Sequence, residues 1–79
     1  MPTILKYRSY RFYFYSHENN EPPHIHIDKD NKSAKFWLNP INLAVNYGFN
    51  QKEINEIEKI LKSSQKLMLD KWREFFDGK

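Results

Sequence analysis

Hydrophobic and polar positions follow two different periods along the chain. In the first half they alternate every second residue, as on a half-buried strand, and in the second half apolar residues recur every three to four positions, as on a helix. Turn-forming residues separate the alternating stretches. We therefore predict four strands, at residues 3–7, 10–16, 24–28 and 33–38.

Residues 41–46 fit two different elements. The stretch has signals of a short helix, with Asn39 as N-cap, Pro40 at the first helical position and Gly48 just past the end. It also alternates like a strand, because its apolar residues are Ile41, Leu43 and Val45. We favour a fifth strand, since this apolar face matches that of the neighbouring strand.

A long helix is predicted at about residues 51–77. Asn50 is its N-cap, Glu53 completes a capping box, and Phe49 can pack onto Ile54 across the first turn. Its apolar stripe comprises Ile54, Ile57, Leu61, Met68, Trp72 and Phe75. The polar run at residues 63–65 is a place where this helix can kink or divide into two.

Turn positions set the expected register of the strands. A slip of one residue would move every side chain to the other face, so matching the apolar faces is a strong constraint. A two-residue turn at Arg8-Ser9 and a turn at residues 29–32 define the two hairpins. The expected pairs are Leu5–Phe12, Thr3–Phe14, Ile27–Ala34, Ile25–Phe36, Arg11–Asp28, Tyr13–His26 and Tyr15–His24.

This register predicts an α+β fold in a single domain, residues 1–79. A four- or five-stranded antiparallel meander packs one face against the C-terminal helix. The packed face carries Leu5, Phe12, Phe14, Ile25, Ile27, Ala34, Phe36, Leu38, Ile41, Leu43 and Val45. The opposite face, which we call the open face, carries Ile4, Lys6, Arg11, Tyr13, Tyr15, His24, His26, Asp28, Lys35 and Trp37.

Composition narrows the classes of function. The chain has 79 residues, no cysteine and a formal net charge of +3. Without cysteine, neither disulfides nor a thiolate zinc site is available. The sequence has neither a signal-peptide pattern nor an apolar run of the ~20 residues that span a membrane, so we expect a cytoplasmic protein without membrane contact. Nothing in it calls for a cofactor.

The open face gathers the residues with the most useful chemistry. His24 and His26 are candidate acid and base groups, because imidazole titrates near neutral pH. The candidates for holding phosphate and nucleic acid are Arg11, Lys35, Lys6 and Tyr13, with Tyr15 and Trp37 as stacking groups. The structural alternative is that the tyrosines are cross-strand packing partners that shield the sheet.

A metal is the weaker interpretation of the same strand. His24 and His26 lie two residues apart, roughly 6–7 Å along a strand, and can chelate only if a third ligand arrives. Asp28, His17 and Glu21 are the candidates for that ligand. Because this spacing is common, we do not predict a metal.

Several blocks of the chain resemble the bacterial family catalogued as domain of unknown function 4160. The similar segments are residues 1–4, 10–16 and 34–38, the block Glu21-Pro22-Pro23-His24-Ile25-His26-Ile27, and the distal Trp72. The resemblance implies a small bacterial or phage domain. It also implies a neighbouring gene, of the family catalogued as domain of unknown function 2442, with which it would form a toxin–antitoxin-like pair.

Three hypotheses follow, and whether the protein is an enzyme stays open among them. The first is a toxin-type component that acts on or binds RNA through the open face. The second is an interaction module that binds a protein or a nucleic acid without turnover, and the third is the metal-binding domain. The expected partners are the small protein from the neighbouring gene, RNA, and a second copy of the chain through an exposed edge strand.

Overall fold

The computed structural model describes residues 3–15 and 20–77 of the chain. The first part of the chain forms one sheet, whose strands are β1 (Thr3–Tyr7), β2 (Tyr10–Tyr13), β3 (His24–Lys29), β4 (Lys32–Leu38) and β5 (Ile41–Tyr47). They lie in the order β1-β2-β3-β4-β5, with every neighbouring pair antiparallel. Two helices follow, α1 (Gln51–Ser63) and α2 (Gln65–Asp77).

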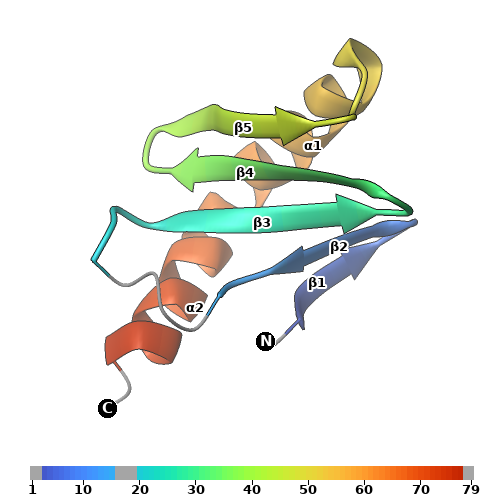
Figure 1. The fold of residues 1–79 in the computed structure, drawn as a ribbon. Helices are drawn as coiled ribbons and strands as arrows, with labels where there is room; N and C mark the ends of the chain where they lie inside the picture. The colour runs from blue at the N-terminus through green and yellow to red at the C-terminus, as the bar shows by residue number, and fades with distance from the viewer. Residues whose placement is uncertain (1–2, 16–19, 78–79) are drawn as a thin grey trace.

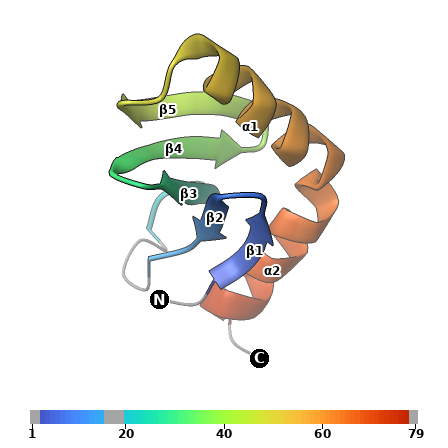
Figure 2. The ribbon, with the colours of Figure 1, turned by 90° about the vertical axis from the view of Figure 1, so that its right-hand side faces the viewer.

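Both helices lie on the same side of the sheet. Figure 2 shows α1 and α2 covering one face, while no helix among the described residues covers the other. In Figure 1, α1 lies behind the β5 end of the sheet and α2 continues toward the end where β3 begins. The predicted α+β meander is therefore confirmed, including its fifth strand. Neither helix among the described residues has the length and apolar composition of a membrane span.

The predicted long helix is divided in two at Ser64. Its start is as expected, because the side chain of Asn50 accepts a hydrogen bond from the Glu53 amide while the Glu53 side chain accepts one from the Asn50 amide. The Ser64 amide bonds to the Leu61 carbonyl, which ends α1 with a tightened turn. The division lets the two helices follow the twisted sheet, and the Gln65 side chain ties the start of α2 to the carbonyl of Leu38.

The register of the central strands matches the predicted one. The structure contains the pairs Leu5–Phe12, Arg11–Asp28, Tyr13–His26, Ile25–Phe36 and Ile27–Ala34. These pairs place one set of side chains under the helices and the other set on the open face. The core beneath the helices is accordingly built from Phe12, Phe14, Ile25, Ile27, Phe36, Leu38, Ile57, Leu61, Met68 and Trp72, with other buried neighbours.

Two predicted pairs at the end of β2 are wrong. An irregularity between Thr3 and Leu5 places Thr3 opposite Tyr13, where Phe14 was expected. It also brings the side chain of Ile4 against the core, although Ile4 was expected on the open face. The strand ends at Tyr13 instead of residue 16, so Tyr15 forms no backbone pair with His24.

A bulge in β5 overturns part of the predicted packed face. Phe36 pairs with Leu43 but Lys35 pairs with Val45, so Ala44 is an extra residue in β5. Val45 therefore shares the open face with Lys35, and its side chain is 37% exposed. Leu43 stays on the helix side but lies at the edge of the sheet, where it is 42% exposed. Ile41 is buried as predicted.

Leu61 and Leu67 offer a matched test of which helix face holds the fold together. Leu61 is fully buried in the core, whereas Leu67 on α2 is 45% exposed. We expect Leu61→Ala to lower the free energy of unfolding by about 2–5 kcal/mol, through lost burial and a cavity. Leu67→Ala should cost less than about 1 kcal/mol. Urea unfolding followed by circular dichroism measures both, and equal losses would contradict this packing.

Candidate functional site

His26 lies at the centre of the open face, in the middle of β3. Its ring stacks on that of Tyr13 at a centroid distance of 5.6 Å and meets the ring of Tyr15 edge-on at 4.3 Å. Lys35 is its neighbour across the strand pair. The predicted association of His26 with Tyr13, Tyr15 and Lys35 is therefore present in the structure.

These residues line a hollow on the open face, which we call the tyrosine hollow. It has a volume of about 220 Å³ and lies over β2, β3, β4 and β5. Its walls are formed by Tyr13, Tyr15, His26, Ser33, Ala34, Lys35, Val45 and Tyr47. Small-molecule sites usually measure ~300–1,000 Å³, so this hollow suits a flat group that stacks against the sheet better than an enclosed substrate.

Tyr13 is the rigid floor of the hollow. Although it belongs to the open face, it is only 3% exposed, because Tyr15 and Arg11 lie over it. Its hydroxyl donates a hydrogen bond to a carboxylate oxygen of Asp28 at 2.9 Å. Burial and the hydrogen bonds to Tyr15 and Asp28 raise the pKa of Tyr13 far above its ordinary 10.0. Tyr13 is therefore a fixed, protonated packing group, as the structural alternative proposed.

The cations of the open face are partly engaged by neighbours. Arg11 lies over the Tyr13 ring, 4.5 Å from its centroid, and its Nε donates a hydrogen bond to the Thr3 hydroxyl. The Lys35 ammonium bonds to Glu21 at 2.7 Å and lies 4.7 Å from the centre of the Trp37 ring. The hydrogen-bonding partners Thr3 and Glu21 are exposed, and a phosphate competes well with them for the two cations.

A second hollow adjoins the first along the two tyrosines. It is lined by Tyr13, Tyr15, Asp28, Asp30, Asn31, Lys32 and Ser33. Two carboxylates make this end of the open face unfavourable for phosphate. Lys35 therefore marks the end of the surface where a phosphate would be held, while Lys6 lies out on the edge strand β1.

His24 is not part of the accessible surface. Its side chain is 1% exposed, and its ring lies 5.0 Å from that of Trp72 on α2 and 5.7 Å from that of Trp37. The expectation that both imidazoles lie on the open face therefore holds for His26 alone. His24 is buried because it lies at the end of the sheet, where β3 begins beside α2 and the helix covers the first residue of the strand.

His24 instead holds the loop that precedes β3. Its Nδ1 lies 2.9 Å from the carbonyl oxygen of Pro22, an acceptor, so this nitrogen carries the proton and donates. The Glu21 carboxylate is 3.7 Å from the same nitrogen. The Pro23 carbonyl accepts from the Leu38 amide, which continues the β3–β4 pairing into the loop. His24 thus positions Glu21 beside Lys35 at the rim of the tyrosine hollow.

Within the part of the chain that the structure describes, the residues required for a metal site do not assemble. Within residues 3–15 and 20–77, no three side chains of the His, Cys, Asp and Glu type gather closely enough to hold an ion. His24 and His26 have ring centroids 5.4 Å apart, but His24 is buried and Asp28 is bonded to Tyr13. His17, the remaining candidate ligand, lies outside the described residues.

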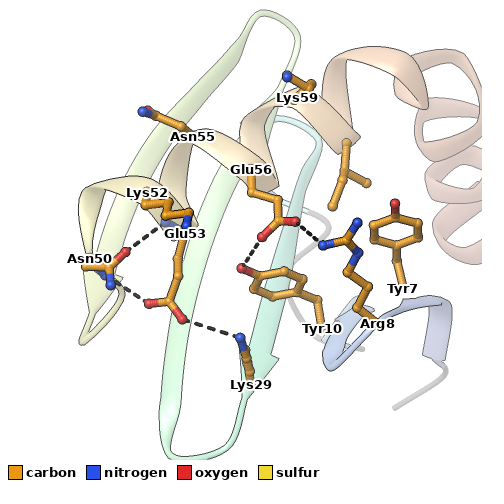
Figure 3. Close-up of a pocket in the computed structure, with 11 residues that line it drawn as sticks. Tyr7, Arg8, Tyr10, Lys29, Asn50, Lys52, Glu53, Asn55, Glu56 and Lys59 are labelled. Carbon is orange, nitrogen blue, oxygen red and sulfur yellow. Dashed lines mark hydrogen bonds and ion pairs between the residues drawn. The ribbon is translucent and has the colours of Figure 1, made fainter.

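A groove larger than the tyrosine hollow lies on the helix side of the sheet, between α1 and the turn that joins β1 to β2. Its volume is about 750 Å³, and Figure 3 shows its lining residues. Glu56 accepts from Arg8 and from the Tyr10 hydroxyl, and Glu53 pairs with Lys29 and Lys32. These bonds connect three strands to α1, so we interpret the groove as the seam that fastens the helix to the sheet.

Three residues of the open-face region were missed by reasoning from the sequence. Val45 and Tyr47 line the tyrosine hollow, and Trp72 encloses His24. No alternation pattern identifies the extra residue in β5, so nothing in the sequence places Val45 on the open face. The helical period correctly identifies Trp72 as a core residue but does not indicate which strand it meets.

The fold and this surface define a class: a small α+β domain with one helix-covered face and one open face built of tyrosines, a histidine and cations. The chain belongs to the family described as Domain of unknown function (DUF4160), whose model matches residues 9–73. No curated protein and no solved structure is significantly similar to it.

Tyr10 makes the seam sensitive to alkaline pH. Burial, followed by the hydrogen bond to Glu56, raises the pKa of Tyr10 from 10.0 to about 12. Because the folded-state pKa is the higher one, the stability from the protonated phenol is complete below about pH 10 and is lost as the pH rises toward 12. We expect the free energy of unfolding to fall over that range, and Tyr10→Phe to reduce the slope.

Urea titrations between pH 8 and 11.5 measure this slope. Tyr7→Phe is the control, since Tyr7 lines the same groove but is 43% exposed. Tyr10→Phe should also lower the stability at pH 8 by about 1 kcal/mol, the usual worth of one hydrogen bond. A slope that is the same in Tyr10→Phe as in the wild type would show that Tyr10 does not cause the alkaline loss.

Proposed function

We propose that the protein binds single-stranded RNA through its open face, as the toxin-type component of a two-gene toxin–antitoxin-like module. The observation that carries the binding proposal is the tyrosine hollow, where aromatic side chains and Lys35 share one exposed sheet surface. Proteins that bind unpaired nucleotides stack bases on exposed aromatic side chains and hold phosphates with nearby cations.

The stacking groups are Tyr15 and His26. Tyr15 follows the end of β2 and is 37% exposed, so part of its side chain is accessible to a base. His26 lies beside Tyr13 across the strand pair, and the two rings are nearly parallel, at an interplanar angle of 23°. A base placed in the hollow would therefore extend a stack that the protein has already begun.

The phosphate group of the bound nucleotide is assigned to Lys35. Its present partner, Glu21, is 41% exposed and the Lys35 side chain is 17% exposed, so the pair lies at the rim of the hollow with its carboxylate open to solvent. An RNA phosphate would take the place of Glu21 beside the same ammonium. Arg11 lies over Tyr13 but pairs across the strands with Asp28, at the acidic end of the open face, so Lys35 is the phosphate contact that the proposal uses.

Binding without turnover is the form of this function that the geometry supports best. RNA cleavage without a metal requires both a base and an acid in reach of the reacting phosphate. Among the described histidines, only His26 lines the hollow, while His24 is enclosed by Trp37 and Trp72. His24 would then act by positioning the loop at residues 21–23, and the acid–base role first considered for it would not apply.

Removing Tyr15 should weaken RNA binding. We expect Tyr15→Ala to raise the dissociation constant for a labelled single-stranded RNA decamer by about 5- to 100-fold, since a base–aromatic stack is worth about 1–3 kcal/mol. Tyr7→Ala is the matched control, because Tyr7 is comparably exposed, at 43%, on the opposite side of the sheet. Fluorescence anisotropy at two salt concentrations measures both variants.

The same titrations test the role of Lys35. Lys35→Gln should lower the affinity and reduce the dependence of log K on log salt by about one phosphate contact. Glu21→Gln should raise the affinity, because it removes the carboxylate that competes with the phosphate for Lys35. RNA binding that is lost equally in Tyr15→Ala and Tyr7→Ala would contradict the location of the site.

The toxin-type setting needs a separate experiment. Support for it comes from the implied two-gene arrangement of the family that the chain resembles, so growth of a bacterial host is the direct measurement. We expect expression of the wild type alone to arrest growth and expression of Tyr15→Ala to do so less. Unchanged growth with the wild type would contradict the toxin-type role, even if RNA binding is observed.

Incubation with labelled RNA separates binding from turnover. The proposal expects the RNA to stay intact over hours, with or without divalent metal. Cleavage that disappears in His26→Gln while binding persists would show that the open face is catalytic, and the binding-only form of the proposal would be wrong.

A further inference from the structure

The two edges of the sheet differ sharply in how they are protected from other strands. An edge strand offers unpaired backbone groups, and natural proteins block them with charges, bulges or cover. At the β1 edge, Lys6 is exposed, the pairing is irregular between Thr3 and Leu5, and Arg11 reaches across to the Thr3 hydroxyl. These features make β1 a poor template for a further strand.

The β5 edge carries one bulge, at Ala44, but no charge. β5 is seven residues long, Ile41–Tyr47, and of the five strands that the structure describes it is the one without a charged side chain. Three of its apolar side chains are exposed: Leu43 at 42%, Val45 at 37% and Tyr47 at 68%. An uncharged edge strand with exposed apolar side chains is a surface suited to pairing with another strand.

We infer that β5 pairs antiparallel with β5 of a second copy of the chain, about a twofold axis near Asn46. The bulge ends at Ala44, and the pairs Lys35–Val45, Ala34–Asn46 and Ser33–Tyr47 show that the last three residues alternate regularly. Around an axis at Asn46, Val45 of each copy lies opposite Tyr47 of the other. Both side chains lie on the open face of their own chain, so this pairing places them on the same side of the joined sheet.

Charge favours a second copy over an unrelated strand as the occupant. Self-pairing across a twofold axis brings each side chain near its own kind, so a charged edge would repel itself. In β5 the opposed groups are apolar, and the Asn46 amide is already bonded to the backbone of Phe49 within its own chain. A strand carrying charges would find no opposite charge in β5 to pair with it.

The dimer would also enlarge the tyrosine hollow. Val45 and Tyr47 form the wall of the hollow nearest to the edge of the sheet. With a twofold axis perpendicular to the sheet, both open faces lie on the same side, and the two hollows meet at the interface. Tyr47, which is 68% exposed in the single chain, would then be covered by Val45 of the second copy.

Sedimentation equilibrium without RNA tests the dimer, so its result is independent of the proposed function. We expect the wild type to be dimeric at high concentration and Val45→Lys to weaken the dimer by about tenfold or more, because an edge lysine blocks strand addition. Leu67→Lys, at a comparably exposed site on α2, should leave it unchanged. A monomeric wild type at every concentration would overturn the inference, as would a dimer that Val45→Lys leaves intact.

Hydrogen exchange on the wild type provides a second measurement that does not depend on a variant. The amides of residues 45–47 should exchange more slowly as the protein concentration rises, by a factor that follows the dimer fraction. The amides of β1 should show no such dependence. Concentration-dependent protection of β1, with none in β5, would place the interface at the wrong edge and overturn the inference.

Discussion

The register of β2, β3 and β4 is the constraint on which the rest of the structure depends. It places Phe12, Ile27 and Ala34 beneath the helices and, one residue away, Tyr13, His26 and Lys35 on the open face. A slip of one residue in any of these strands would exchange the two sets and destroy both the core and the candidate site. The hydrophobic core and the surface chemistry are therefore two results of one pairing.

The β1–β2 and β3–β4 pairings could be predicted from the sequence because both hairpin turns are short, whereas the β2–β3 pairing could be predicted because only one register matches the apolar faces. Arg8 and Asp30, which begin the two turns, have a positive φ of 56°, and the strand pairs follow directly from these turns. The capping box at Asn50 and Glu53 likewise set the start of α1. For the two hairpins and the start of α1, a local signal of a few residues was sufficient.

The errors lie where tertiary contacts outweigh local pattern. The bulge at Ala44 leaves no trace in the alternation of residues 41–46, so Val45 was assigned to the packed face although it lines the hollow. His24 has the same strand parity as His26, yet α2 covers it because Trp72 reaches the start of β3. The position of α2 over the start of β3 depends on the division of the helix at Ser64 and on the twist of the sheet.

These corrections change the role of the two histidines. As an equivalent pair they suggested acid–base catalysis or a metal, but one is a buried support for the loop and the other is part of an aromatic stack. One connected group links His24, Glu21 and Lys35. The buried imidazole of His24 holds the loop that precedes β3, and the Glu21 carboxylate of this loop pairs with the Lys35 ammonium at the hollow. The same loop therefore holds Glu21 beside Lys35 and supplies the carboxylate that would compete with an anionic ligand for this cation.

Nuclear magnetic resonance can locate the bound RNA on the molecule directly. In a titration of labelled protein with a single-stranded RNA, the account predicts shift changes at Tyr15, His26 and Lys35, and at Val45 and Tyr47 on the far wall of the hollow. The resonances of the groove residues Tyr7, Asn55 and Lys59 on the helix side should not move. Shifts confined to that groove, with none on the open face, would contradict the central claim.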